Sequence, residues 1–156
     1  MDGKERAAQI YQQFKDHLDS HQIHYTPHDE DQVLTLTAQG EDLPMPVVIH
    51  VIAEREVVKL YSPLPCDFPE DKRVDAALAV CSLNNKLMNG TFDLDIGDGS
   101  VSFRLCQSFH DNDISEVQIR YMMVILFKTV DEYNDSLFAL AKGLMSLEQF
   151  FEKTQN

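Results

Sequence analysis

The chain has 156 residues, of which 26 are acidic and 13 are basic, so its formal net charge is −13. A chain of this length can form one domain over residues 1–156 and bury about two thirds of its unfolded surface. The acidic excess repels phosphate backbones and anionic lipid headgroups, which argues against nucleic acids and membrane surfaces as partners. The opening MDGKERAAQIYQQF is charged and amphipathic, unlike a signal segment, so we expect a cytoplasmic protein.

The first helix and a three-stranded segment are predicted from periodicity. From residue 4 to residue 19, apolar residues recur at steps of three and four, namely Ala7, Ile10, Phe14 and Leu18. Residues 33–38 alternate between apolar and polar, residues 46–53 are apolar almost throughout, and residues 56–62 follow as a third strand. The continuous apolar run predicts that the middle strand is covered on both faces.

A second helix is predicted over residues 69–88, with Asp67 as its N-cap and an Asn-Gly pair as its stop. We expect its buried face to consist of Val74, Ala77, Leu78 and Cys81. Asn84 and Asn85 interrupt the apolar pattern, so we expect at least one of them to be partly buried and hydrogen-bonded to the following loop.

The next stretch, TFDLDIGDGSVSFRL over residues 91–105, contains three aspartates and two glycines. A calcium loop starting at Asp93 would need an oxygen ligand at its fifth position, where Gly97 stands. A phosphate loop would need a lysine and a following helix, and both are missing from the pattern. We therefore predict a structural hairpin that binds neither calcium nor magnesium tightly.

The predicted hairpin turns at Asp98-Gly99, a dipeptide that readily adopts the positive φ angles of a tight turn. Its register places apolar residues on one face and polar residues on the other. The predicted pairs are Ile96 with Val101, Leu94 with Phe103, Phe92 with Leu105, Asp95 with Ser102, and Asp93 with Arg104.

Two capping boxes predict the last two helices. One begins at Ser115 and opens a long helix that reaches about Lys142 and stops at Gly143, and the other begins at Ser146 and opens a short helix. The predicted fold class is therefore α+β, an antiparallel sheet of about five strands packed against helices. Its element order is α-β-β-β-α-β-β-α with a short C-terminal helix.

The long helix contains YMMVILF at residues 121–127, more apolar residues than one core-facing stripe requires. The main stripe comprises Ile119, Met122, Leu126, Val130, Tyr133, Leu137, Leu140 and Leu144. Either the helix is sandwiched within the domain, or its second face contacts another chain. On the second alternative, we select Met122, Met123 and Phe127 as candidate partner-binding residues and expect a homodimer.

The sequence also resembles a known family. The similarity lies in Asn84-Asn85, Gly90, Phe92, Leu94-Asp95, Asp98-Gly99, Val101 and Arg104, followed by the long helix and the tail SLEQFFEK. In these features the chain resembles the YbjN-like proteins, whose domain is similar to the type III secretion chaperone fold. The resemblance implies a small, acidic, non-enzymatic bacterial protein, a regulator of sensory transduction. It supplies no catalytic residues.

The alternative hypothesis, a metal site, rests on four histidines. His17, His21, His24 and His28 are three or four residues apart, which on one continuous helix would place their rings at metal-binding range. A small metal-dependent hydrolase could use such a site. Pro27 interrupts any such helix, so we favour a solvated helix end and loop without metal.

Other reactive residues give little support for catalysis. Cys106 and His110 are close in sequence, but neighbouring aspartates oppose a reactive thiolate. The three cysteines lack a Cys-x-x-Cys spacing and are expected to be reduced and mostly buried. His50 lies in the most apolar strand and is expected to be satisfied internally or to face Lys59.

We therefore predict a cytoplasmic protein-binding module, chaperone-like or regulatory, without enzymatic activity or a cofactor. An apolar surface and the edges of the sheet would recognise an extended protein or peptide client.

Overall fold

The structure, a computed structural model, describes residues 1–155. The helices span Gly3–Ser20 (α1), Arg73–Asn84 (α2), Glu116–Ala141 (α3) and Leu147–Thr154 (α4). The strands span Thr26–His28 (β1), Val33–Gln39 (β2), Pro44–Ile52 (β3), Val57–Pro63 (β4), Thr91–Leu94 (β5) and Val101–Ser108 (β6). Short 3-10 turns cover Ala53–Arg55 and Glu70–Lys72. No helix among these residues is long and apolar enough to cross a membrane.

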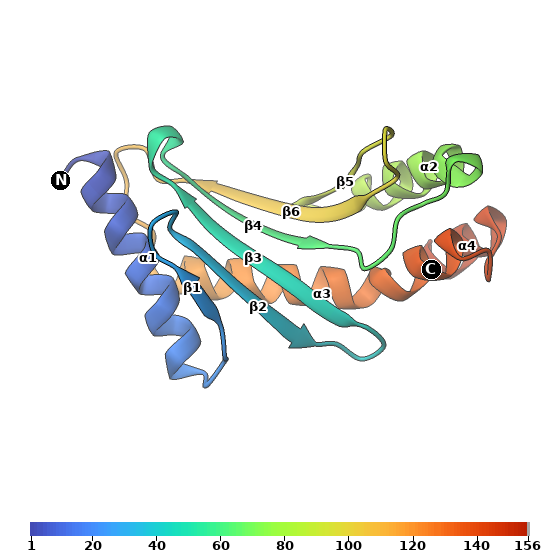
Figure 1. The fold of residues 1–156 in the computed structure, drawn as a ribbon. Coiled ribbons are helices and arrows are strands. Elements are labelled where there is room, and N and C mark those ends of the chain that lie inside the picture. The colour runs from blue at the N-terminus through green and yellow to red at the C-terminus, as the bar shows by residue number, and fades with distance from the viewer. Residues whose placement is uncertain (156) are drawn as a thin grey trace.

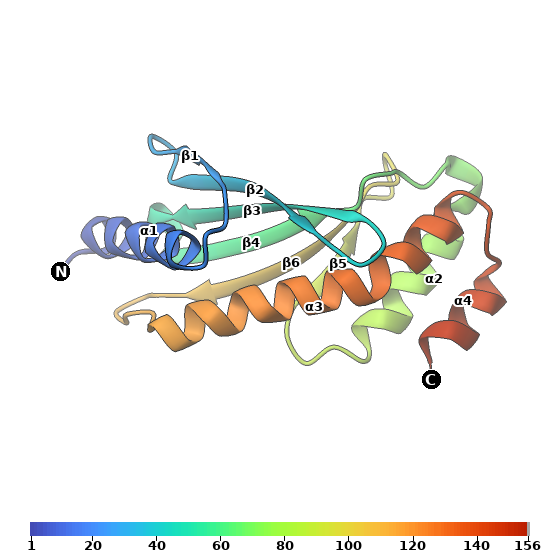
Figure 2. The ribbon, with the colours of Figure 1, turned by 90° about the horizontal axis from the view of Figure 1, so that it is seen from below.

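The six strands form one antiparallel sheet in the order β1-β2-β3-β4-β6-β5. Helices α1 and α3 lie along one face of this sheet, whereas α2 and α4 gather at the end that holds β5 (Figures 1 and 2). The predicted α+β class and element order are confirmed. The additional strand, β1, is three residues long and contains Pro27, so its sequence carries no clear strand pattern.

The face of the sheet that points away from α1 and α3 carries no helix in the described chain (Figure 2). Along β3, buried and half-buried residues alternate, so the prediction that this strand is covered on both faces is wrong. Val48 on the open face lies opposite Tyr61, and His50 lies opposite Lys59 as expected. A cross-strand neighbour such as Tyr61 partly covers an apolar side chain on the open face, although no helix packs there. Apolar residues can therefore occupy both faces of β3, and the strand sequence is apolar almost throughout.

Helix ends follow the predictions at three termini and depart from them at α2. Capping boxes at Ser115 and Ser146 open α3 and α4, and Gly143, with a φ of 73°, follows the end of α3. Helix α2 begins only at Arg73, and its N-cap residue provides no side-chain hydrogen bond, so the predicted cap at Asp67 is wrong.

Asn84 ends α2 and joins it to β5. Its Nδ2 donates to the carbonyl oxygen of Phe92 at 3.0 Å, and the Phe92 N–H donates to its Oδ1 at 2.8 Å. The side-chain amide therefore satisfies both backbone groups of one strand residue. Asn84 is half-buried and hydrogen-bonded as expected, but its partner lies in β5 and not in the loop that follows the helix.

The β5–β6 hairpin forms, but its register differs by two residues from the prediction. Phe92 lies opposite Phe103, and Leu94 lies opposite Val101. The loop is closed by a hydrogen bond from the Asp95 N–H to the Ser100 carbonyl oxygen at 2.9 Å. The predicted two-residue turn requires a positive φ at both of its central residues, Asp98 and Gly99. Only Gly99 has a positive φ, so this turn does not form.

Docking of the hairpin loop accounts for this register. The Phe68 N–H donates to the Gly99 carbonyl oxygen at 2.8 Å, and Arg73 Nη1 donates to the Gly97 carbonyl oxygen at 3.0 Å. The four-residue loop thus places these carbonyl groups against Phe68 and against Arg73, the first residue of α2. Ile96, predicted to face the core, is consequently 69% exposed.

Candidate protein-interaction surfaces

One face of α2 carries apolar side chains that are open to solvent. Val74 is 73% exposed, Leu78 is 50% exposed, and Cys81 is exposed as well. These residues are four and three positions apart, so they lie on the same side of the helix. We call the surface formed by Val74, Ala77, Leu78 and Cys81 the α2 stripe. Monomeric proteins seldom leave contiguous apolar surface uncovered, which makes the α2 stripe a candidate binding site.

The opposite face of α2 is the one that packs into the core. Its buried residues are Ala76, Ala79, Val80 and Leu83. We predicted the reverse orientation, and that prediction is wrong. Because both sides of this helix are apolar, periodicity identifies a helix without deciding which face is buried. The exposure of Cys81 and Cys106 also shows that the prediction of mostly buried thiols is wrong.

The charge on α2 contrasts with that of the chain. The helix contains one cation, Arg73, and one anion, Asp75, so its side chains have no net charge, whereas the chain carries −13. Charge repulsion between two acidic proteins is therefore weaker at this helix than over the rest of the surface.

The apolar excess of α3 is only partly absorbed by the core, because Tyr121 is 48% exposed and Val124 is 41% exposed. Met122 is 3% exposed and Met123 is 2% exposed, whereas Phe127 is half-buried at the surface. The two methionines therefore belong to the core, whereas Tyr121 and Val124 leave another face of the helix open to solvent, so both alternatives stay open. That Met122, Met123 and Phe127 bind a partner stays a prediction, and of these three only Phe127 offers surface for such a contact.

Two grooves adjoin the part of β2 that β1 does not cover. We call the one on the α3 side the inner groove; it has a volume of about 530 Å³ and is lined chiefly by Ile23, Ala38, Met45, Phe127, Lys128 and Asp131. We call the one on the open face of the sheet the outer groove; it also has a volume of about 530 Å³ and is lined chiefly by Tyr25, Thr35, Thr37, Pro46 and Val48. His24 and Thr37 line both grooves.

The four N-terminal histidines do not share one site. His17 is buried in α1 and stacks at 4.4 Å between ring centroids on His21, whereas His28 lies in β1 and contacts Thr35. Burial lowers the pKa of His17, and the His21 ring lowers it further. His24 lines the two grooves. Residues 1–155 contain no group of three metal-ligating side chains, so the geometry needed by the metal-dependent hydrolase is not present.

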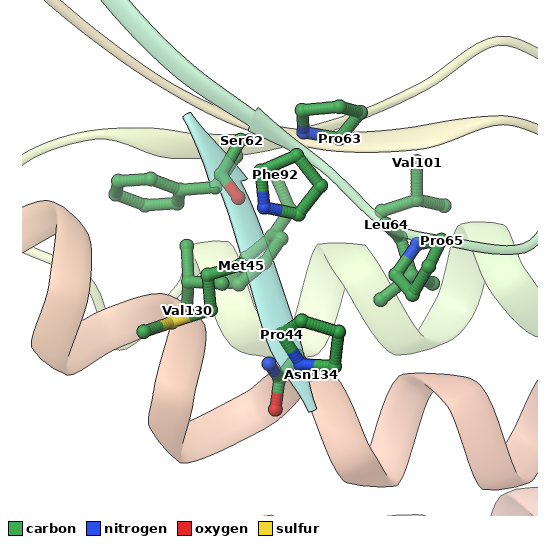
Figure 3. Close-up of a pocket in the computed structure, with 12 residues that line it drawn as sticks. Pro44, Met45, Ser62, Pro63, Leu64, Pro65, Phe92, Val101, Val130 and Asn134 are labelled. Atoms are coloured by element: carbon green, nitrogen blue, oxygen red, sulfur yellow. The ribbon is translucent and has the colours of Figure 1, made fainter. Parts of the chain in front are cut away.

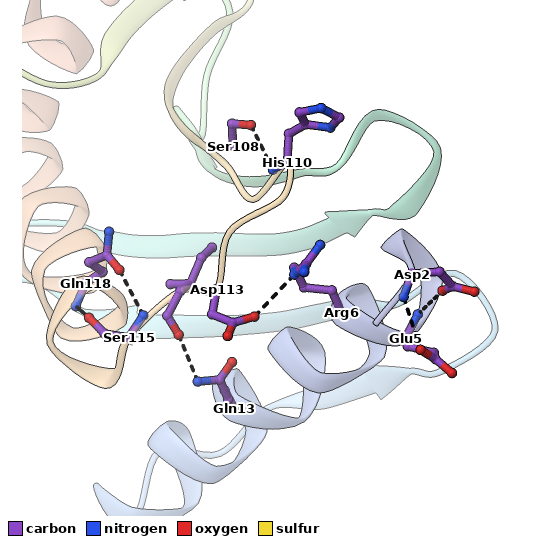
Figure 4. A network of polar contacts seen from close by, with 10 residues as sticks. Asp2, Glu5, Arg6, Gln13, Ser108, His110, Asp113, Ser115 and Gln118 are labelled. Atoms are coloured by element: carbon purple, nitrogen blue, oxygen red, sulfur yellow. Dashed lines mark hydrogen bonds and ion pairs between the residues drawn. The ribbon is translucent and has the colours of Figure 1, made fainter.

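A polar network fastens α1 to the segment that precedes α3 (Figure 4). Arg6 Nε donates to Asp113 Oδ1 at 3.2 Å, and Gln13 Nε2 donates to the Ile114 carbonyl oxygen at 2.9 Å. At the edge of this network His110 contacts Glu56, which raises the pKa of the imidazole through a hydrogen bond and charge attraction. These contacts hold α1 against the segment that leads into α3. The charged groups of this network therefore have a structural role.

A small cavity lies where β3 and β4 diverge above α3 (Figure 3). Prolines from both strands surround it, and Ser62 and Asn134 face it from β4 and α3 (Figure 3). Its volume of about 10 Å³ is close to that of a single water-sized sphere. The cavity is therefore too small to be a substrate or cofactor site.

Comparisons with known proteins agree with this geometry. The YbjN family model, described as "Putative bacterial sensory transduction regulator", matches residues 11–139. The chain is similar to a crystal structure of YbjN, "a putative transcription regulator from E. coli", at 12% identity and a TM-score of 0.60, over 83% of this chain and 90% of that chain. It is also similar to a chain in the crystal structure of the ExsC–ExsE complex, at 15% identity and a TM-score of 0.65, over 88% of this chain and 97% of that chain. No curated protein matches.

At such identities the solved structures show the fold alone. They confirm the expected fold, that of the YbjN-like proteins and the type III secretion chaperones. The family model covers far more than half of the sequence, and the chain therefore belongs to the YbjN family.

Proposed function

We propose that this chain is a non-enzymatic protein-binding module of the cytoplasm, chaperone-like or regulatory, and that the α2 stripe is its main binding surface. The observation that carries the proposal is the exposure of Val74 and Leu78, at 73% and 50%, on a helix whose other face is buried. The family description as a regulator and the fold shared with a chain of the ExsC–ExsE complex support a role in protein binding.

The partner at the α2 stripe is a second copy of the chain. Two copies at −13 repel each other, and a helix without net charge offers the approach with least repulsion. Ala77, at the centre of the stripe, has a small side chain that lets two helices pack closely. In an antiparallel pair with its two-fold axis near Ala77 and Leu78, Val74 of one copy lies opposite Cys81 of the other.

The oligomeric state of a charged variant tests this interface. We expect the native chain to be a dimer in light scattering, and Leu78→Glu to be a folded monomer because it places a carboxylate in the apolar contact. Val117→Glu is the matched control, since Val117 is 66% exposed in the first turn of α3, which starts at the opposite end of the molecule from α2 (Figure 2), and this variant should remain a dimer. A dimeric Leu78→Glu, or a native chain that is monomeric at all accessible concentrations, would contradict the interface.

A cross-link tests the antiparallel arrangement independently. In a background with Cys66→Ser and Cys106→Ser, the variant Val74→Cys should form a disulfide-linked dimer under mild oxidation, because residues 74 and 81 of opposite copies are neighbours. The same background with Val74 retained has Cys81 alone, which lies away from the axis and should not cross-link efficiently. Equal cross-linking of the two proteins would exclude this helix pairing.

A further inference from the structure

A cavity lies between α1 and α3, separate from the α2 stripe and from the inner and outer grooves. It has a volume of about 300 Å³ and is lined by Gln13, Asp16, His17, Ser20, Glu116 and Ile119. Small-molecule sites in proteins have volumes of about 300–1,000 Å³. The cavity is therefore large enough for a small organic ligand.

Two buried polar groups at this cavity have no hydrogen-bond partner. His17 is 8% exposed, and its ring nitrogens form no hydrogen bond within residues 1–155, where Ser20 and His21 bond only to its backbone carbonyl oxygen. Gln13 Nε2 donates across to the segment before α3 (Figure 4), but Gln13 Oε1 is buried and unpaired. Because buried polar groups are nearly always hydrogen-bonded, two unpaired groups at one cavity indicate that a bound molecule satisfies them.

Both unpaired groups offer acceptors. Burial lowers the pKa of His17, and the neighbouring His21 ring lowers it further, whereas the Glu116 carboxylate acts in the opposite direction. The ring is therefore uncharged at neutral pH, and one of its nitrogens can accept a hydrogen bond. An amide oxygen such as Gln13 Oε1 is an acceptor as well. A ligand that satisfies both groups must donate hydrogen bonds.

The rim of the cavity is acidic. Asp16 from α1 and Glu116 from α3 line it and are exposed. Asp16 accepts a hydrogen bond from the neutral Gln12 side chain at 2.9 Å. Neither carboxylate forms an ion pair within residues 1–155, and Arg120, one turn along α3 from Glu116, pairs with neither. Two uncompensated carboxylates at the opening of a cavity attract a cation.

We propose that this cavity binds a small organic cation whose guanidinium group donates hydrogen bonds to His17, to Gln13 and to the two rim carboxylates. A guanidinium group carries five N–H donors in one plane and no acceptor, which suits a cavity whose unpaired groups are all acceptors. A metal ion does not fit, because residues 1–155 contain no group of three metal-ligating side chains. The bound cation would join α1 to α3, and this site is additional to the proposed protein-binding function.

The probe is n-butylguanidinium, measured by isothermal titration calorimetry and by NMR at neutral pH and physiological salt. We expect saturable binding, with chemical-shift changes at residues 13–20 and 116–119. The matched control ligand is N-butylurea, which has nearly the same shape but no charge, and an oxygen in place of one donor group. It should bind more weakly by about tenfold or more, because hydrogen bonds from an ionised donor are the stronger ones.

Variants of the protein locate the site. Glu116→Gln removes one rim carboxylate and should weaken n-butylguanidinium binding by about fivefold or more. Glu132→Gln is the matched control, since it removes the same charge from an exposed position about 24 Å further along α3 and should bind like the native chain. His17→Phe keeps a buried aromatic ring without its nitrogens and should also weaken binding, with circular dichroism showing that the fold is kept.

Three results would overturn the proposal. Absence of saturable n-butylguanidinium binding would mean that the cavity holds water alone. Equal binding of n-butylguanidinium and N-butylurea would mean that charge is not recognised. Equal weakening by Glu116→Gln and Glu132→Gln would mean that the cation binds elsewhere on the acidic surface. Each result is independent of the oligomeric state, because the cavity lies within one chain.

Discussion

Gly99 allows the sharpest test of how the hairpin loop is held. Its φ is 78°, in the left-handed region that residues with a side chain rarely adopt. A Cβ at this position would lie 2.0 Å from the Phe68 carbonyl oxygen and 3.0 Å from Arg73 Nε. The contact is close because the Phe68 N–H donates to the Gly99 carbonyl oxygen, so the two backbones run against each other.

The cost of Gly99→Ala follows from these contacts. An alanine in the left-handed region costs roughly 1–2 kcal/mol, and loss of the hydrogen bond to Phe68 adds about 0.5–1.5 kcal/mol. Displacing the fully buried Phe68 side chain adds to this sum, so we expect a loss of about 2–4 kcal/mol in the free energy of unfolding. For a chain of this size, that corresponds to a melting temperature lower by roughly 4–16 °C.

Urea titration followed by circular dichroism measures this difference. Gly97→Ala is the matched control in the same loop, because Gly97 has no positive φ and a Cβ at that position would meet only Asp95 Oδ1, at 3.1 Å. That control should change stability by less than about 0.5 kcal/mol. If the two variants lose equal stability, the loop is not held against Phe68 in this way.

Further predictions concern titration, the helix end and metal binding. Because Glu56 raises the pKa of His110, the protonated ring stabilises the fold below its unfolded pKa of about 6.5, and this contribution is lost as pH rises through the raised value. His110→Gln should therefore lose urea resistance at about pH 5.5 but not at about pH 8.5, and an NMR-measured pKa at or below about 6.5 would contradict this. Asn84→Ala should cost about 1–3 kcal/mol in urea titrations, because it leaves the backbone N–H and C=O of a β5 residue unpaired, whereas the exposed neighbour Asn85→Ala should cost less than about 0.5 kcal/mol. Calorimetry should detect no tight calcium binding, because two aspartates of the β5–β6 loop already accept backbone N–H groups, and micromolar affinity would refute this.

Local sequence determined most elements of the fold. The steps of three and four in α1, the capping boxes of α3 and α4, and the positive φ of Gly143 depend on residues within a few positions of one another. The bonding of Asn84 could also be predicted, because a polar residue that interrupts an apolar helix face near its end needs a partner close by. The family resemblance rested on these same local signals.

Tertiary packing decided which surfaces are open. Both faces of α2 are apolar, and only its contacts with β5, α3 and α4 select Ala76 and Leu83 as buried and leave Leu78 exposed. The hairpin register depends on a hydrogen bond between Phe68 and Gly99, 31 positions apart in the chain, which competes with the local preference of Asp98-Gly99 for a tight turn. The candidate binding surfaces could not be predicted for the same reason. The sequence pattern shows which residues are apolar, whereas their exposure depends on which distant segments pack against them.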